Sequence, residues 1–395
     1  MKGMKSMYKK LFVSLGLCAA GAVMLSKKKA SAWFSDTHSA ILESALDILK
    51  NDNKTEAYKF YEAHKDIISY GAIVPDFKGD RNKGSGMHYY SSCDKNGNVL
   101  QPTLTGYFAN RLGAYAPSAR TMLEENYTMS FIQFANDMTD MALDSLGRCV
   151  HFISDIGCTV HTTNLISLPT KNNPHHCYEK YAFANMDRFH AVIGDDKLYN
   201  CYMNKSVGEM LNILSWESSK YYKDVKAVKN TTFENALRNM LPRTEQHVAA
   251  FLNAYYEKLS DNKASALRVK KNIRIKSVCD GSYLTIYENG RAGLSKLNNC
   301  LNQIFNIRLN LDGSIRIMNK QGNLVCDGMF GFKCGDAIKN NGFRLTETDG
   351  FYKITTEYSR FSKMLTNCKR HIKYRLFQKD FNPLDDGQLW VIEKA

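Results

Sequence analysis

The hydrophobic period of the 395-residue chain changes near residue 262, and this change limits the folds that the chain can adopt. Before it, apolar residues recur every three to four positions, as in HSAILESALDILKND (38–52), and mark one face of an amphipathic helix. After it, short runs of alternating apolar and polar residues are separated by Asp-Gly and Asn-Gly pairs, which are typical of strands joined by hairpin turns. The sequence therefore predicts a multidomain protein, with an all-α domain over 33–262 and an all-β domain over 270–395.

Proline positions and a weak repeat agree with this division. Six of the seven prolines precede residue 262, and we expect them at helix ends, Pro174 and Pro242 among them. In the second half, a loose repeat of about 40 residues indicates three units, near 272–312, 313–352 and 353–395.

The composition excludes several classes of protein. Hydrophobic residues make up 44% of the chain and charged residues 23%, so the chain is neither disordered nor collagen-like nor a many-span membrane protein. The formal net charge is +14, but residues 1–32 contain seven Lys and no acid, which leaves +7 on the other 363 residues. A charge of this size does not indicate a nucleic-acid partner and is compatible with an anionic substrate or surface.

The first 32 residues have the features of a secretory signal peptide. A Lys-rich start is followed by an apolar run over 11–25 and by Ala30-Ser31-Ala32, a small-residue cleavage site. This run is shorter than the ~20 residues that a membrane-spanning helix needs. We therefore expect a secreted protein that begins at Trp33; an uncleaved amphipathic anchor is the alternative. The ten cysteines other than Cys18 form an even number, as expected for disulfides in an oxidising compartment, but their pairing cannot be read from the sequence.

Histidines and carboxylates recur at spacings that suit metal binding. His151 and Asp155 are four residues apart on a predicted helix and so share a face, as do His175 and Glu179. Gly157 is expected to end the first of these helices, which lets the later His161 turn back toward it. Upstream lie His38, Asp76 and His88. Mixed imidazole and carboxylate ligands suit Zn²⁺, although each pair alone is more often a surface pair, so the prediction depends on the combination.

Together these residues resemble the zinc-dependent phospholipase C family, which comprises bacterial phosphatidylcholine-cleaving enzymes and related toxins. The resemblance extends over about residues 33–260 and consists of separate motifs. The matching positions are Trp33, Thr37-His38, Pro75-Asp76-Phe77, His88, His151 with Asp155 and His161, and His175 with Glu179.

The resemblance implies a helical phospholipase- or nuclease-like fold that binds three zinc ions. One ion takes Asp76, His88, His151 and Asp155; the second takes the amine and carbonyl of Trp33, with His38 and Asp155; the third takes His161, His175 and Glu179.

The resemblance also implies the reaction, which is hydrolysis of the glycerol–phosphate ester bond of a membrane phospholipid by a zinc-activated water. We expect Asp76 to act as general base or to orient the water, with Glu179 as the second catalytic candidate. Selection of a quaternary ammonium headgroup needs an aromatic or acidic cage. Phe77, Tyr89 and Tyr90 are the aromatic residues near the ligands in sequence.

Two other functions remain open. The short gap between Trp33 and His38 resembles three-zinc nucleases that cleave single-stranded nucleic acid, whereas Glu179 and the gap of 14 residues before His175 favour the phospholipase branch. We therefore expect no nucleic-acid partner. The other alternative is a lectin or adhesin whose helical half holds structural zinc. The sequence does not indicate an oligomeric state.

The second half resembles the ricin-type β-trefoil lectin repeat over about 270–395. Gln303-Ile304-Phe305 and Gln388-Leu389-Trp390 match its Gln-x-aromatic hallmark, while Gly342-Phe343 stands at the degenerate middle position. The resemblance implies a carbohydrate-binding domain that targets cell-surface glycans, with Asp280 and Asp327 as candidate sugar ligands, although the Gln-x-aromatic positions are more often structural. A calcium-dependent lipid-binding sandwich is the alternative fold.

Overall fold

The computed structural model describes most of the chain from residue 35 onward. The described residues are 35–77, 80, 87–90, 108–109, 115–163, 165, 170, 172–260, 271–310, 314–327, 331–335, 342–348, 350–356, 363–368, 376–379 and 385–395. The predicted signal peptide and Trp33 lie outside the described residues.

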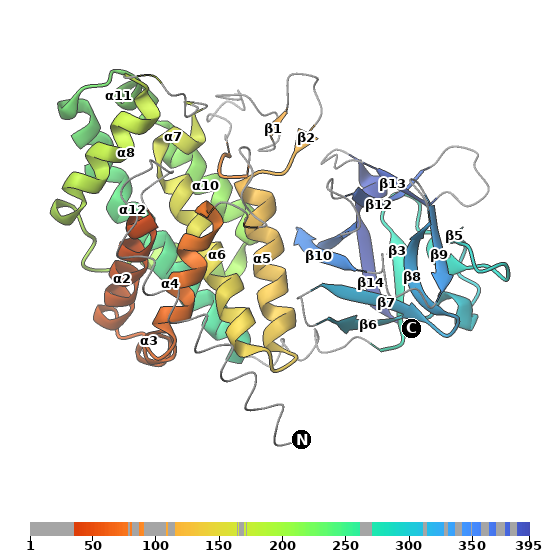
Figure 1. Ribbon diagram of the computed structural model, residues 1–395. Helices are drawn as coiled ribbons and strands as arrows, with labels where there is room; N and C mark the ends of the chain where they lie inside the picture. Colours follow the sequence, from red (N-terminus) through yellow and green to blue (C-terminus); the bar gives the residue numbers. More distant parts are fainter. Residues whose placement is uncertain are drawn as a thin grey trace, which may run out of the picture. The chain divides into compact units, whose positions relative to one another are not determined.

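Helices form the first half of the described chain (Figure 1). They are α2 (Ser35–Asn51), α3 (Thr55–Glu62), α4 (Lys65–Ile73), α5 (Ala119–Phe134), α6 (Thr139–Gly157), α7 (Thr159–Thr162), α8 (Pro174–Asn185), α9 (Asp196–Asn204), α10 (Val207–Ser219), α11 (Tyr222–Lys226) and α12 (Asn230–Ser260), with 3₁₀ turns η1 (Val74–Asp76) and η2 (Met186–Arg188). Two short strands, β1 (Phe108–Ala109) and β2 (Tyr115–Ala116), pair with each other before α5. The predicted all-α class of this half is confirmed.

Helix α6 lies at the centre of the helical domain. Every residue from Ser145 to Gly157 is buried, so this helix is covered on all sides rather than on one face. Its crossing with α4 is made close by two glycines: a Cβ on Gly147 would lie 2.1 Å from the Ile68 carbonyl oxygen, and one on Gly71 would lie 2.3 Å from that of Asp144. The polar side chains of α6 are therefore held in a tightly packed interior.

The prediction that prolines lie at helix ends is confirmed for Pro174 and wrong for Pro242. Pro174 opens α8, where Asn173 caps the helix by accepting from the His176 amide. Pro242 lies inside α12 rather than at its end. A proline there removes one helical hydrogen bond, to the carbonyl of Arg238 on an exposed turn, where water can bond to that oxygen.

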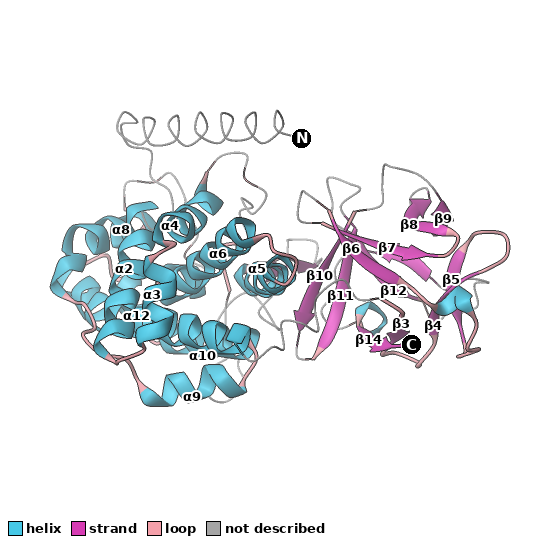
Figure 2. Cartoon of the chain, turned by 90° about the horizontal axis from the view of Figure 1, so that it is seen from below, coloured by secondary structure: helices cyan, strands magenta, loops and turns pink. Residues whose placement is uncertain are grey.

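The second half is an all-β domain (Figure 2). Its strands are β3 (Ile273–Ser277), β4 (Tyr283–Ile286), β5 (Ala292–Ser295), β6 (Asn306–Leu309), β7 (Ile315–Asn319), β8 (Gly322–Asp327), β9 (Gly331–Gly335), β10 (Phe343–Thr348), β11 (Phe351–Thr356), β12 (Lys363–Asn367), β13 (Leu376–Lys379) and β14 (Trp390–Lys394), with 3₁₀ turns η4 (Leu301–Gln303) and η5 (Asp386–Gln388).

The strand pairing is that of a β-trefoil. Antiparallel pairs link β3, β14, β11, β10, β7 and β6 in that order, and a bridge between Ile273 and Phe305 closes the ring. The other strands form three hairpins, β4–β5, β8–β9 and β12–β13. The chain thus repeats one four-strand unit three times, close to the predicted units, and ring closure removes the edges that a sandwich would expose. The predicted trefoil is confirmed.

The Gln-x-aromatic residues build this domain's interior. Phe305, Phe343 and Trp390 are fully buried, at equivalent positions of the three units. The buried Gln303 amide donates to the Thr285 and Ser295 hydroxyls and to the Lys296 carbonyl. These contacts give the motif a structural role.

The Asp280 carboxylate, one of the predicted sugar ligands, takes part in the packing of the trefoil. Its Oδ1 accepts from the Ser282 amide and hydroxyl and from the Asn367 amide, which joins the β3–β4 turn to the end of β12. The side chain of Asp327 lies outside the described residues.

Candidate metal centre

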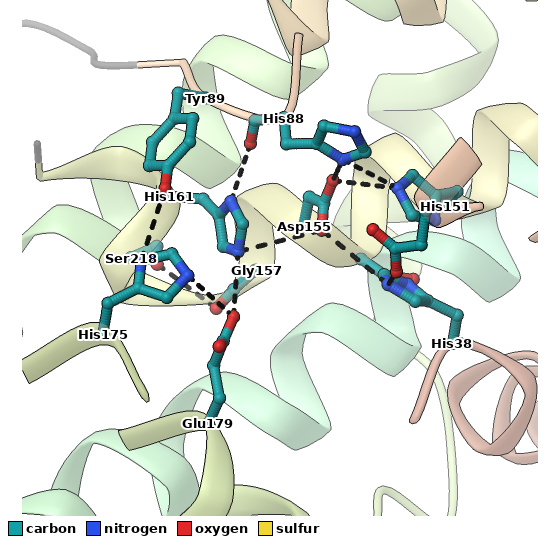
Figure 3. A network of polar contacts seen from close by, with 12 residues as sticks. His38, His88, Tyr89, His151, Asp155, Gly157, His161, His175, Glu179 and Ser218 are labelled. Atoms are coloured by element: carbon teal, nitrogen blue, oxygen red, sulfur yellow. Dashed lines mark hydrogen bonds and ion pairs between the residues drawn. The ribbon is translucent and has the colours of Figure 1, made fainter. Parts of the chain in front are cut away.

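Six separate segments bring together the predicted ligands other than Trp33 (Figure 3). α2 supplies His38, η1 supplies Asp76, and residues 87–90 supply His88. α6 supplies His151 and Asp155, one turn apart, and ends at Gly157 as predicted; α7 then supplies His161, and α8 supplies His175 and Glu179.

Packing fixes the junction between α6 and α7. The Ser218 hydroxyl of α10 donates to the Gly157 carbonyl, and the Thr159 hydroxyl donates to the Ser218 carbonyl. A Cβ on Gly157 would lie 2.0 Å from Thr244 Oγ1 of α12, so a side chain does not fit there. The junction thereby sets His161 relative to Asp155.

The eight described ligands are buried and form three groups, each with ligand atoms within 4.8 Å of one another. His38 groups with Asp76 and His151, His88 groups with His151 and Asp155, and His161 groups with His175 and Glu179. The most exposed of the eight, His88, has a relative exposure of 8%. A cluster of this many ionisable groups without water is stable only when the charges are paired or bound to metal.

Asp155 lies between the imidazoles and presents each oxygen to a different pair. Oδ2 is 2.9 Å from His88 Nδ1 and 3.1 Å from His151 Nε2. Oδ1 is 3.8 Å from His38 Nε2 and 3.9 Å from His161 Nε2. Burial by itself would raise the pKa of Asp155, but His151 and His161 hold it well below its usual range. An ionised carboxylate with two differently directed oxygens can bridge two cations.

Glu179 joins the two remaining imidazoles. Its Oε1 is 2.9 Å from His175 Nε2 and 3.4 Å from His161 Nε2. Burial by itself would raise the pKa of Glu179, but hydrogen bonds from His161 and His175 lower it to about 2. Its carboxylate therefore stays ionised at neutral pH.

Backbone carbonyls orient three of the histidines. The Nδ1 atoms of His151, His161 and His175 lie 2.8, 2.9 and 2.7 Å from the carbonyl oxygens of Ala72, His88 and Leu165, respectively. A carbonyl only accepts, so each Nδ1 is a protonated donor, and each Nε2 faces the cluster as the atom available to a metal. This is the usual arrangement of metal-binding histidines.

Buried atoms of His38 and Asp155 lack the hydrogen bonds that burial normally requires. Both ring nitrogens of His38 and the Oδ1 atom of Asp155 have no hydrogen-bond partner among the described residues. Burial, together with the charge of His151, lowers the pKa of His38 well below its usual value, so its ring is neutral at physiological pH. A neutral imidazole and an ionised carboxylate aimed at the same space fit a divalent cation such as Zn²⁺.

An ion pair that the sequence analysis missed joins Asp80 to helix α6. The Arg148 guanidinium of α6 donates to both oxygens of Asp80, at 2.8 and 3.1 Å, and to Asp144. Neither the positions of the orienting carbonyls nor this pair has a signal in the spacing of residues, because both depend on the fold.

The three aromatic headgroup candidates lie in different surroundings. Phe77 is 39% exposed, next to Asp76. The Tyr89 ring lies 5.0 Å from the His161 ring and 5.9 Å from that of His175. Tyr90 is buried in the helical core, and its hydroxyl bonds to Asn212. Phe77 and Tyr89 therefore lie beside the cluster, whereas Tyr90 packs in the helical core.

The structure gives no support to the predicted disulfides within its described ranges. Nine cysteines lie there, and no disulfide joins any two of them. In the same ranges, no helix has the length and apolar character needed to cross a membrane.

Solved structures that are similar to this protein match either nearly the whole chain or about a third of it. Alpha toxin from Clostridium absonum is 15% identical, with coverage of 94% of this chain and 99% of that chain and a TM-score of 0.47. Alpha-toxin from an avian strain of Clostridium perfringens is 14% identical, with coverage of 91% and 96% and a TM-score of 0.45. The designed three-fold symmetric protein ThreeFoil is 17% identical, with coverage of 31% and 98% and a TM-score of 0.27.

A family comparison identifies the helical domain. The curated proteins contain no match to the chain. The family described as zinc dependent phospholipase C matches residues 37–228, a range that includes all eight described candidate ligands. Over these residues the helical domain therefore matches the zinc-dependent phospholipase C family, and this match supports phospholipase C activity.

Proposed function

We propose that the protein is a secreted phospholipase C that hydrolyses the glycerol–phosphate ester bond of phospholipids such as phosphatidylcholine. The observation that supports this most directly is the convergence of eight buried imidazoles and carboxylates into three adjoining groups. The family match supports phospholipid as the class of substrate.

Three zinc ions would be held as the family resemblance implies. The first site would use Asp76, His88, His151 and Asp155, and the second would add Trp33 to His38 and Asp155. The third would use His161, His175 and Glu179. Bound Zn²⁺ would lower the pKa of a water and polarise the phosphoryl oxygens of the substrate.

Asp76 is the better candidate for the proton-transfer role. Its Oδ2 lies 3.7 Å from His38 Nε2, at the side of the cluster next to the exposed Phe77. Glu179 is held by two imidazoles, which lower its pKa to about 2, so it is a poor proton acceptor. We assign to Asp76 the orientation of the attacking water or the acceptance of its proton, and to Glu179 metal binding.

Phe77 and Tyr89 would recognise a quaternary ammonium headgroup. An exposed aromatic ring beside the metal cluster offers the π-face that such a cation prefers. The trefoil would direct the enzyme to cell-surface glycans, with Asp280 and Asp327 as the candidate sugar ligands.

The decisive experiment combines substrate and metal in one set of assays. Purified protein should release phosphocholine from phosphatidylcholine, lose this activity with a chelator and regain it with added Zn²⁺. Single-stranded DNA is assayed in parallel, and its hydrolysis in place of phosphatidylcholine would establish the nuclease alternative. If the protein binds zinc but hydrolyses neither substrate, the result would favour the alternative of a lectin or adhesin with structural zinc.

A pair of α6 variants tests the assignment of the ligands. Asp155→Asn removes the charge that two sites would share, so we expect the loss of about two of three zinc ions and at least a 100-fold fall in activity. Asp140→Asn changes the same residue type at an exposed position of the same helix and should leave both unchanged. Equal zinc content in the two variants would contradict the proposed centre.

A further inference from the structure

Helix α5 contacts both the trefoil and the segment that holds His88. Its residues Met129 and Ile132 are buried within the hydrophobic cluster of the trefoil. At its other end, the first amide of the helix, that of Ala119, donates to the Tyr89 carbonyl at 3.1 Å. One rigid helix therefore joins the β-domain to the residue that follows a metal ligand.

On the trefoil side, the contacts to α5 are polar as well as apolar. The Thr348 hydroxyl of β10 donates to Glu124 Oε2 at 2.8 Å, and the Glu347 amide donates to the Thr128 hydroxyl at 2.8 Å. Arg344 forms an ion pair with Glu125, with a distance of 3.0 Å between Nη1 and Oε1.

Glu124 connects the trefoil to the side of α5 that faces the metal centre, because it contacts both Thr348 and Arg120. It is 2% exposed, and its Oε1 accepts from Arg120 Nε at 2.8 Å. The Arg120 guanidinium also reaches the Tyr90 hydroxyl, at 3.4 Å. A Cβ on Gly208 of α10 would lie 2.3 Å from Glu124 Oε1, so a third helix confines the pair. A buried carboxylate in this position depends on every donor that it has.

On the site side, residues 88–90 are bonded to ligands as well as to α5. The Tyr90 amide donates to the His161 carbonyl at 3.0 Å, and the His161 ring bonds to the His88 carbonyl. A displacement of α5 would therefore move the backbone that orients both His88 and His161.

We propose that Glu124 and Arg120 are positioning residues through which the trefoil fixes the His88–Tyr90 segment of the metal centre. The contact from Thr348 to Glu124 holds the Glu124–Arg120 pair, and the first turn of α5 holds Tyr89 and Tyr90. The inference rests on the proposed metal centre, but it concerns the trefoil as a structural support of that centre in addition to any targeting role.

The test uses Thr348→Val in the full chain, because valine keeps the shape and removes the hydroxyl. In metal-free protein we expect hydrogen–deuterium exchange of the Tyr90 and Ala119 amides to be about three- to tenfold faster than in the unmodified chain. We expect the affinity for Zn²⁺, titrated alone, to fall by a similar factor. Neither measurement needs a substrate, so both remain informative if phospholipid is not hydrolysed.

Two matched variants separate this link from general effects. Thr356→Val makes the same change at a buried trefoil hydroxyl that has no hydrogen-bond partner among the described residues, and it should change neither measurement. Thr128→Val removes another hydroxyl of the same interface without touching the Glu124 carboxylate. Equal exchange and zinc affinity in the Thr348 and Thr356 variants would overturn the proposal. So would equal effects of the Thr348 and Thr128 variants.

Discussion

At the scale of single residues, Glu217 shows how a charged side chain stabilises the helical domain. Arg243 of α12 forms two hydrogen bonds with it, at 2.9 Å each, and the buried His247 lies 3.4 Å away. Burial by itself would raise the pKa of Glu217, but hydrogen bonds from His247 and Arg243 lower it from 4.5 to about 2. Its charge therefore links α10 to α12.

This lowered pKa predicts a loss of stability in acid. A carboxylate with a lower pKa in the folded state stabilises the fold fully above its unfolded-state pKa, and the contribution disappears as the pH falls from about 4.5 toward 2. Because the side chain is 21% exposed, we expect Glu217→Gln to cost about 2 kcal/mol at pH 7 and much less at pH 2.5. Urea unfolding at both pH values measures this difference. Glu56→Gln, at an exposed residue, serves as the control, and a cost for Glu217→Gln that does not change with pH would refute the assignment.

Two pairs of candidate ligands could be recognised from spacing because each pair is local, whereas grouping His38, Asp76 and His88 with them depended on the family resemblance. His151 and Asp155, or His175 and Glu179, meet on one helix face by spacing alone. The carbonyls of Ala72 and Leu165 that fix the imidazole tautomers could not be predicted, since their approach depends on how other helices pack. The place of Trp33 stays a prediction.

At the scale of elements, the crossing of α4 and α6 determines whether Asp76 reaches the cluster. η1 follows α4 directly, so Asp76 lies where α4 places it against α6. The sequence analysis predicted the helix of His151 and Asp155 within an all-α domain, but it did not single out α4. Glycine inside a helix is only a weak propensity signal, so the close contact between Gly71 and Gly147 was not predicted. The prediction for Pro242 was wrong for a related reason. Helix propensity places a proline at a helix end, but tertiary packing keeps α12 helical on both sides of Pro242.

Gly147→Ala tests this crossing. The added methyl would lie 2.1 Å from the Ile68 carbonyl oxygen, and a backbone atom cannot turn aside as a side-chain end can. We expect a loss of about 3 kcal/mol in unfolding free energy, with weaker zinc binding because Asp76 moves with α4. Gly335→Ala, where nothing lies within 4 Å of the added atom, should cost less than about 0.5 kcal/mol. Similar losses for both variants would show that the crossing does not limit stability.

At the scale of the whole molecule, the sequence predicted two domains but not their contact. The trefoil could be predicted because its repeat places an aromatic at the same point of each unit, as Phe305, Phe343 and Trp390 show. The outer face of α5 could not, because its apolar residues point in several directions and no periodicity marks Met129 and Ile132 as contacts of a β-domain.

This contact predicts that the helical domain and the trefoil unfold together. Met129 and Ile132 are 1% and 4% exposed, and removing two such side chains from an interior costs several kcal/mol, about 2–5 kcal/mol each. We expect the helical signal in circular dichroism and the hydrogen-exchange protection of the trefoil strands to be lost at the same urea concentration in the unmodified protein. In the double variant Met129→Ser with Ile132→Ser, the two transitions should separate, because the interface that couples them is lost while each core is otherwise intact. Separate transitions in the unmodified protein would mean that α5 only touches the trefoil and cannot transmit its position to the metal centre.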